Sequence, residues 1–175
     1  MSLSYFPRIQ NWLIHASGWR ETLDELALDG KRANEGIVLW LGKRKEELGI
    51  ITQLFFLRGP GIIKQPNFLM ISADLMNQVT EEALRLEVKL LGQAHSHGSS
   101  YYTDLSHTDI EGGIAFPHYL SIVVPDYGLR KETCIADCGV HIFEEGGRFR
   151  RFSRGESRSR ISLDKTTSFG ITEVG

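Results

Sequence analysis

The chain has 175 residues, which is enough for one domain with a single core. Its hydrophobic fraction of 41%, charged fraction of 24% and formal net charge of -2 are those of an ordinary globular protein, and they argue against nucleic-acid or membrane partners. No apolar run reaches the roughly 18–20 residues that span a bilayer. The first residues lack the apolar stretch of a signal peptide, so we expect a cytoplasmic protein.

The first third of the sequence predicts a strand, a helix and two further strands. Ser4–Ala16 mixes apolar and polar residues as a first strand can. Apolar residues then fall at helical spacing from Trp19 to Ala27. Glu35–Leu41 is typical of a buried strand that begins with a carboxylate, and Leu48–Leu57 is a second apolar run. Gly59-Pro60-Gly61 ends that run in a loop.

The middle of the sequence predicts strand, helix, strand. Phe68–Ile71 is a short apolar run, and Ser72 after it is a good helix N-cap. Leucine, valine and alanine then keep helical spacing, which predicts a helix from about Ala73 to Val88. Leu90–Ala94 runs as a strand into His95. The loop before Phe68 contains Ile62 and Ile63, which could be an exposed recognition patch or could be buried under the loop.

The last part of the sequence predicts further strands and a tail. Tyr119–Val124 and Cys134–Glu144 are expected strands, and the Gly146-Gly147 turn leads into Arg148–Ser153 as a pairing partner. Residues 154–175 are rich in Ser, Arg, Thr and Gly and are expected to be a loosely ordered tail. We therefore predict one mixed α/β domain over residues 1–153, with a sheet and two main helices.

Two other features have competing interpretations. Cys134 and Cys138 lie four apart on an expected strand, so they should share a face as free core cysteines, since no further ligands suggest a second zinc site. A run of arginines surrounds Phe149 and Phe152, and could bind nucleic acid or an acidic protein face. The acidic total charge favours a solvated strand and tail. The arginines are Arg148, Arg150, Arg151, Arg154, Arg158 and Arg160.

His95-Ser-His97 is the strongest chemical signal in the chain. It follows an expected strand, where residues i and i+2 point to the same face, so both imidazoles can reach one ion. Asp109 follows at the start of an expected short helix capped by Ser106. Two neutral nitrogens and one carboxylate are a usual ligand set of catalytic zinc, with the fourth position open.

Amide hydrolysis also needs a group that moves protons and a donor that faces the oxyanion. Glu35 is the best candidate for the first role, because a carboxylate heading an apolar strand should be desolvated and its pKa raised. Ser106 is the candidate for the second. Each residue alone has a simpler explanation: a buried histidine pair, an exposed strand end, a helix cap. The ordered set of Glu, His-x-His and Ser-x-x-Asp is what favours a site.

That set, Glu35, His95-Ser-His97, Ser106 and Asp109, resembles the signature of the JAMM (MPN+) metallopeptidases. The resemblance covers about residues 33–128. It implies a mixed sheet flanked by helices with a topology similar to the zinc deaminases. It also implies zinc on the two histidines and Asp109, with Glu35 as the catalytic acid/base and Ser106 as the oxyanion donor.

The chain departs from the family pattern in the loop after His97. Gly98 stands where the family usually has Pro, and one residue more than usual separates His97 from Asp109. This leaves Asp104 as a rival third ligand, although Ser106 at the Ser-x-x-Asp offset favours Asp109.

Within the family, the phrases GQAHSH and YLSIVVPDYG resemble prokaryotic JAB-domain proteins, and Glu35-Gly-Ile-Val-Leu-Trp40 resembles members of bacterial antiphage operons of the Bil and CBASS types. That implies a deubiquitinase-like isopeptidase that removes a ubiquitin-like protein from its precursor or conjugates. Ubiquitin-activating-like and ubiquitin-conjugating-like enzymes would be its partners. The alternatives are a metallopeptidase that trims small peptides or sulfur-carrier tails, and an inactive scaffold domain.

Overall fold

The computed structural model describes residues 8–175, so the part of the expected first strand before residue 8 lies outside it. The chain order begins β1 (Asn11–His15), α1 (Ala16–Gly30), β2 (Ile37–Lys45), β3 (Leu48–Leu57), β4 (Ile62–Gln65), β5 (Phe68–Ile71), α2 (Ala73–Arg85) and β6 (Lys89–Ser96). It continues with α3 (His107–Gly112), β7 (Leu120–Val124), β8 (Gly139–Phe143), β9 (Phe149–Arg151), α4 (Arg154–Arg160), β10 (Ile161–Asp164) and β11 (Gly170–Val174). Short 3-10 turns cover Asp126–Gly128 and Ile135–Asp137.

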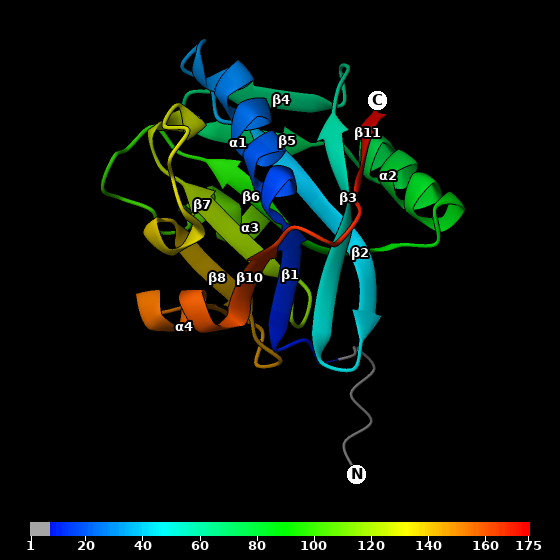
Figure 1. Ribbon diagram of the computed structural model, residues 1–175. Helices are drawn as coiled ribbons and strands as arrows, with labels where there is room; N and C mark the ends of the chain where they lie inside the picture. The colour runs from blue at the N-terminus through cyan, green and yellow to red at the C-terminus, as the bar shows by residue number, and fades with distance from the viewer. Residues whose placement is uncertain (1–7) are drawn as a thin grey trace.

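One mixed sheet carries most of these strands, in the order β10-β1-β3-β2-β6-β7-β8-β9, with β11 also paired to β3. Only seven residues of helix, α4, link the edge strand β9 to the opposite edge strand β10. The two edges must therefore lie near each other, and the sheet is curled, as Figure 1 shows. The expected mixed α/β class, with two main helices against a sheet, is confirmed.

The two faces of the sheet bury separate cores because strand residues alternate between faces. On β2, Val38 and Trp40 point into a core shared with α1, where Trp19 meets Trp40 edge-on at 6.0 Å between ring centroids. Leu39 and Leu41 point into a second core shared with α2, whose Leu75, Val79 and Ala83 face the sheet. The functional face described below is the one that α2 covers (Figure 1).

Residues 154–175 do not form the expected loose tail. Ser153 and Glu156 form a reciprocal capping box that starts α4. β10 pairs in parallel with β1, and β11 pairs in parallel with β3. Val174 is buried in the second core. The polar composition misled the prediction because these strands are stabilised by pairing with distant strands rather than by apolar runs of their own.

Two other expectations need correction. The expected strand Cys134–Glu144 is interrupted: Cys134 precedes a 3-10 turn and is exposed, while Cys138 is buried just before β8. The two thiols therefore do not share a face.

The loop containing Ile62 and Ile63 is a strand, β4, which forms a two-stranded sheet with β5. Ile62 packs on the second core, while Ile63 pairs with the exposed Met70 on the outer side.

None of the helices in the described part of the chain combines the length and apolar character that a membrane span requires.

Candidate metal centre

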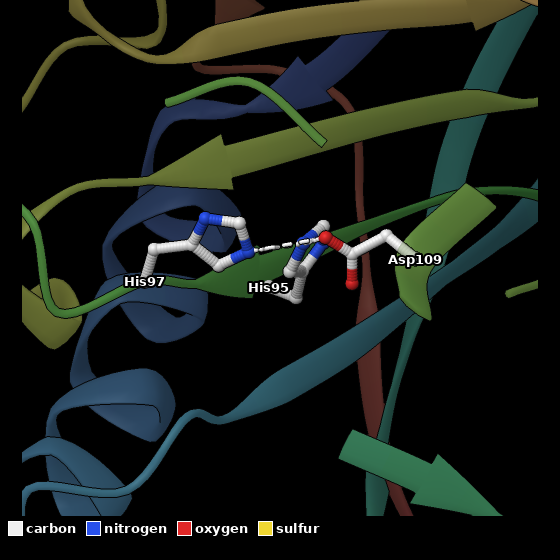
Figure 2. A group of neighbouring side chains, drawn as sticks. All are labelled: His95, His97 and Asp109. Atoms are coloured by element: carbon white, nitrogen blue, oxygen red, sulfur yellow. Dashed lines mark hydrogen bonds and ion pairs between the residues drawn. The ribbon is translucent and has the colours of Figure 1, made fainter. Parts of the chain in front are cut away.

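His95, His97 and Asp109 come together at the end of β6, on the sheet face that α2 and α3 cover. His95 lies on β6 and His97 directly follows it, so the two-residue spacing aims both rings the same way. Asp109 lies in the first turn of α3. Figure 2 shows both rings turned toward the Asp109 carboxylate. All three side chains offer ligand atoms within 4.8 Å of one another.

The three ligand atoms have the spacing that a tetrahedral zinc site requires. Nε2 of His95 and Nε2 of His97 lie 3.2 Å apart. Asp109 Oδ2 is 3.5 Å from the first and 3.2 Å from the second. Zinc bonds of about 2.0–2.1 Å at tetrahedral angles give ligand–ligand distances of roughly 3.3 Å. The donor set and its spacing therefore fit a zinc ion.

The electrostatics of the cluster favour a cation. His95 is 1% exposed and His97 8% exposed, so the groups face each other away from bulk water. Burial opposes ionisation of Asp109, but hydrogen bonds from His95 and His97 outweigh it and hold the pKa of this carboxyl well below its usual range. A negative oxygen and two imidazole nitrogens converge on one point.

Ser106 holds Asp109 in position through a capping box. The Ser106 N–H donates to Asp109 Oδ2 at 2.7 Å, and the Asp109 N–H donates to Ser106 Oγ at 3.1 Å. The expected cap at Ser106 is confirmed. Because Oδ2 is also the atom that faces both histidines, the serine fixes the carboxylate that the cluster uses. The hydroxyl lies 2.9 Å from Thr108 Oγ1.

Glu35 lies beside the cluster because of the register between β2 and β6. Ile37 pairs with His95 in the antiparallel ladder, so Glu35 stands opposite His97. The Glu35 N–H donates to the carbonyl of Gln65 at 3.0 Å, which ties the residue to the β4–β5 hairpin. The residue is 6% exposed, and burial raises the pKa of its carboxyl to about 7, against a smaller opposing effect of His97. The raised pKa that the sequence led us to expect for Glu35 agrees with its burial in the structure.

Asp104, the rival ligand, lies outside the cluster. Its carboxylate forms an ion pair with Arg151, and His141 Nε2 is 3.7 Å away. The arginine run is likewise paired with acidic residues: Arg148 and Arg150 with Glu144, Arg150 and Arg160 with Glu156, and Arg154 with Asp137. Most of its positive charge is therefore offset locally.

Gln93 is a site residue that the sequence interpretation missed. Its amide nitrogen lies 3.3 Å from Nδ1 of His95, on the side of the ring away from Asp109. The signal was present, because Gln93 precedes His95 by two residues and so shares its face of β6.

The loop after His97 is held by Tyr127. The Tyr127 N–H donates to the His97 carbonyl at 2.8 Å, and its hydroxyl donates to the Pro66 carbonyl in the β4–β5 turn at 3.1 Å. The ring lies against Gly98 so closely that a Cβ there would meet it at 2.6 Å. A side chain at this position would force the ring to move, so the close contact accounts for glycine at position 98.

Comparison with solved structures shows that this chain shares its fold with a bacterial protein. Protein DSY2949 from Desulfitobacterium hafniense is 15% identical over 88% of this chain and 93% of its own, with a TM-score of 0.60. AF2198, a JAB1/MPN domain protein from Archaeoglobus fulgidus, is 16% identical over 82% of this chain and 94% of its own, with a TM-score of 0.40, too low to establish a common fold. No protein-family model and no curated protein matches the chain.

Proposed function

We propose that this protein is a zinc-dependent peptidase or isopeptidase. The observation that carries the proposal is the triangle of His95 Nε2, His97 Nε2 and Asp109 Oδ2 at zinc-site spacing, with the buried carboxyl of Glu35 beside it. A zinc ion held there would supply a Lewis acid that activates water and polarises a carbonyl.

Side chains of the protein supply proton transfer and a hydrogen bond to the oxyanion. A carboxyl whose pKa is about 7 exchanges a proton readily near neutral pH, so Glu35 accepts the proton of the attacking water and passes it to the leaving amine. The hydroxyl of Ser106, at the N-terminus of α3, is the donor proposed for the oxyanion. The buried positions of His95 and Glu35 restrict the water that reaches the reaction.

The substrate proposed first is the C-terminal tail of a ubiquitin-like protein, in its precursor or in conjugates. Support comes from the resemblance of Glu35, His95-Ser-His97 and Ser106-x-x-Asp109 to the JAMM signature. The narrower resemblance to JAB-domain proteins of antiphage operons extends the proposal to bacterial defence, with activating-like and conjugating-like enzymes as partners. Within the described residues β5 pairs only with β4. The other edge of β5, near the proposed zinc site, therefore has unpaired backbone groups that an extended peptide can bind.

A cavity favours a second substrate class, short peptides with an apolar side chain near the cleaved bond. It has a volume of about 120 Å³ and reaches His95 and Asp109. Its apolar wall is formed by Ile37, Leu69, Ile71, Met76 and Ile114. Such a pocket accepts one side chain. A peptide series in which the residue beside the cleaved bond changes from Gly to Ala, Val and Leu distinguishes the classes: glycine is best for a ubiquitin-like tail and Val or Leu for the pocket.

Glu35→Ala tests the proposed chemistry. The variant should lose cleavage of a ubiquitin-like protein extended at its C-terminus by a reporter peptide, at least about 100-fold, because proton transfer contributes that much. Its zinc content should stay at that of the wild-type protein. Glu81→Ala, which changes an exposed glutamate of α2, is the control and should leave the rate unchanged. An unchanged rate in Glu35→Ala would remove this residue from the mechanism.

Asp109→Ala and Asp104→Ala test the ligand set. Asp109→Ala should weaken zinc binding by more than the roughly 10- to 100-fold cost of losing an outer partner, whereas Asp104→Ala should bind zinc normally. Chelator competition measures both affinities, with His107→Ala, an exposed histidine of α3, as the control. Wild-type protein that holds no zinc after purification without chelators would instead favour an inactive scaffold domain.

A further inference from the structure

Both histidines face Asp109 through Nε2, so a metal would bind each ring at that atom. A neutral imidazole that binds a metal through Nε2 carries its proton on Nδ1. The group that contacts Nδ1 of His95 therefore influences whether the ring can act as a ligand. In this structure that group is the side-chain amide of Gln93, at 3.3 Å.

The amide of Gln93 is itself held in place by β7 and by the residue just before it. The Tyr119 hydroxyl donates to Gln93 Oε1 at 2.8 Å, and Gln93 Nε2 donates to Ser121 Oγ at 3.4 Å. Tyr119 is 0% exposed, Ser121 2% and Gln93 8%. Parallel pairing of β6 with β7 sets Gln93 directly beside Ser121. A long, flexible side chain is thus fixed next to the His95 ring.

An amide can offer either an acceptor or a donor to the ring, because a half-turn exchanges its oxygen and nitrogen. The nitrogen that faces Nδ1 here suits a His95 whose proton is on Nε2. A metal at Nε2 needs the reverse, a protonated Nδ1 facing an acceptor. The half-turn supplies Oε1 to Nδ1 of His95 and to the Ser121 hydroxyl, which then donates to it, and it sends the amide nitrogen toward the Tyr119 oxygen.

We propose that Gln93 is the positioning residue of His95. It orients the ring and accepts a hydrogen bond from Nδ1–H through Oε1, which leaves Nε2 available to a metal. The role rests on the zinc centre under Proposed function. It reaches the chemistry through His95 and not through contact with substrate. Hydrogen bonds to the second nitrogen of metal-binding histidines contribute to metal affinity in this way.

Gln93→Met and Gln93→Glu test the role in the full chain. Methionine keeps the length of the side chain and removes its polar atoms, so zinc affinity measured by chelator competition should fall about 10- to 100-fold. Glutamate keeps an acceptor and should restore affinity to near the wild-type value. Gln78→Met, the same change at an exposed glutamine of α2, is the matched control and should bind zinc normally.

Nitrogen-15 NMR of the His95 ring provides a readout that a merely structural role would not change. In the zinc form of the wild-type protein, the Nδ1 proton of His95 should show the downfield shift of a proton hydrogen-bonded to Gln93 Oε1. Wild-type zinc affinity in a folded Gln93→Met, or an Nδ1 proton without this shift in the wild-type zinc form, would overturn the role of Gln93 while leaving the metal centre intact. If Gln93→Met does not fold, the ring spectrum of the wild-type protein decides. A wild-type protein that binds no zinc would defeat the proposed function itself.

Discussion

Glu35 is a buried residue beside the candidate metal centre. Its carboxyl lies among buried groups and next to the ionised Asp109, so its charge is unfavourable in the folded protein without a metal. The folded-state pKa of about 7 exceeds the ordinary value of 4.5. A group raised in this way contributes stability below its unfolded pKa and loses that contribution as pH rises through the folded pKa.

Glu35→Gln should therefore change how the stability of the metal-free protein depends on pH. Relative to wild type, the variant should gain free energy of unfolding between about pH 4.5 and 7, by on the order of 3 kcal/mol at most, and hold that gain above pH 7. Urea denaturation across this range measures the difference. A difference that is the same at every pH would mean that Glu35 ionises as it does in water.

The sequence predicted that His95 and His97 lie together, because residues two apart along a strand point to the same face. The sequence left Asp104 as an alternative to Asp109 for the third ligand. In the structure Asp104 is paired with Arg151 instead. The spacing of Gln93 from His95 indicated a shared face of β6, but a glutamine residue by itself does not indicate a role at a metal site. Its role depends on the hydroxyl of Tyr119, which directly precedes a different strand, β7.

At the scale of elements, the β6–α3 loop and the β4–β5 hairpin are joined by one side chain. Tyr127 contacts the loop at Gly98 and the hairpin at Pro66, and both it and Asp126 have left-handed backbone angles with φ of 53°. Two consecutive non-glycine residues in this region are strained, and such strain persists only where surrounding contacts impose it. The two elements that flank the candidate metal centre are therefore coupled.

Gly98→Ala should test this coupling through a double-mutant cycle. In the wild-type background the new methyl group collides with the Tyr127 ring, so the substitution should cost about 1–3 kcal/mol. In a Tyr127→Ala background it should cost nothing, or stabilise slightly by restricting the unfolded chain. Free energies from urea denaturation give the coupling. Equal costs in both backgrounds would show that the ring does not define the loop.

Elements with strong local signals were predicted well. Ser72 starts α2 as expected, and β3 and β5 have the predicted bounds. β4 was taken for part of a loop because Gly59, Pro60 and Pro66 surround it. The turn between Gln65 and Phe68 could have indicated a hairpin. Ser153 with Glu156 was a readable capping box before α4.

At the scale of the molecule, the second core depends on β11. Val174 is buried there, the Arg58 N–H donates to its carbonyl at 2.8 Å, and the Arg58 side chain bridges the buried Glu25 to Glu173. This network joins α1, β3 and β11. These contacts hold residues 170–175 against the domain, contrary to the expected loose tail.

Removal of residues 170–175 should lower the free energy of unfolding by more than about 2 kcal/mol, because it exposes apolar surface and leaves Glu25 with a weakened partner. Val174→Ala should account for part of the loss, while Ile171→Ala, at an outward position 43% exposed, should cost little. Thermal or urea unfolding measures each variant. A truncated protein as stable as wild type would restore the view of this segment as a tail.

The parallel pairing of β10 and β11 also sets the order in which the chain can fold. Trp12 pairs with Ile161, and Leu57 pairs with Val174. Such distant contacts form slowly, since the entropy of closing long loops must be lost first. Until they form, one edge of β1 and part of β3 lie open with apolar side chains beside them, and open edges promote association between chains. The refolding yield should therefore fall as protein concentration rises, because association between chains competes with the pairing of β10 and β11.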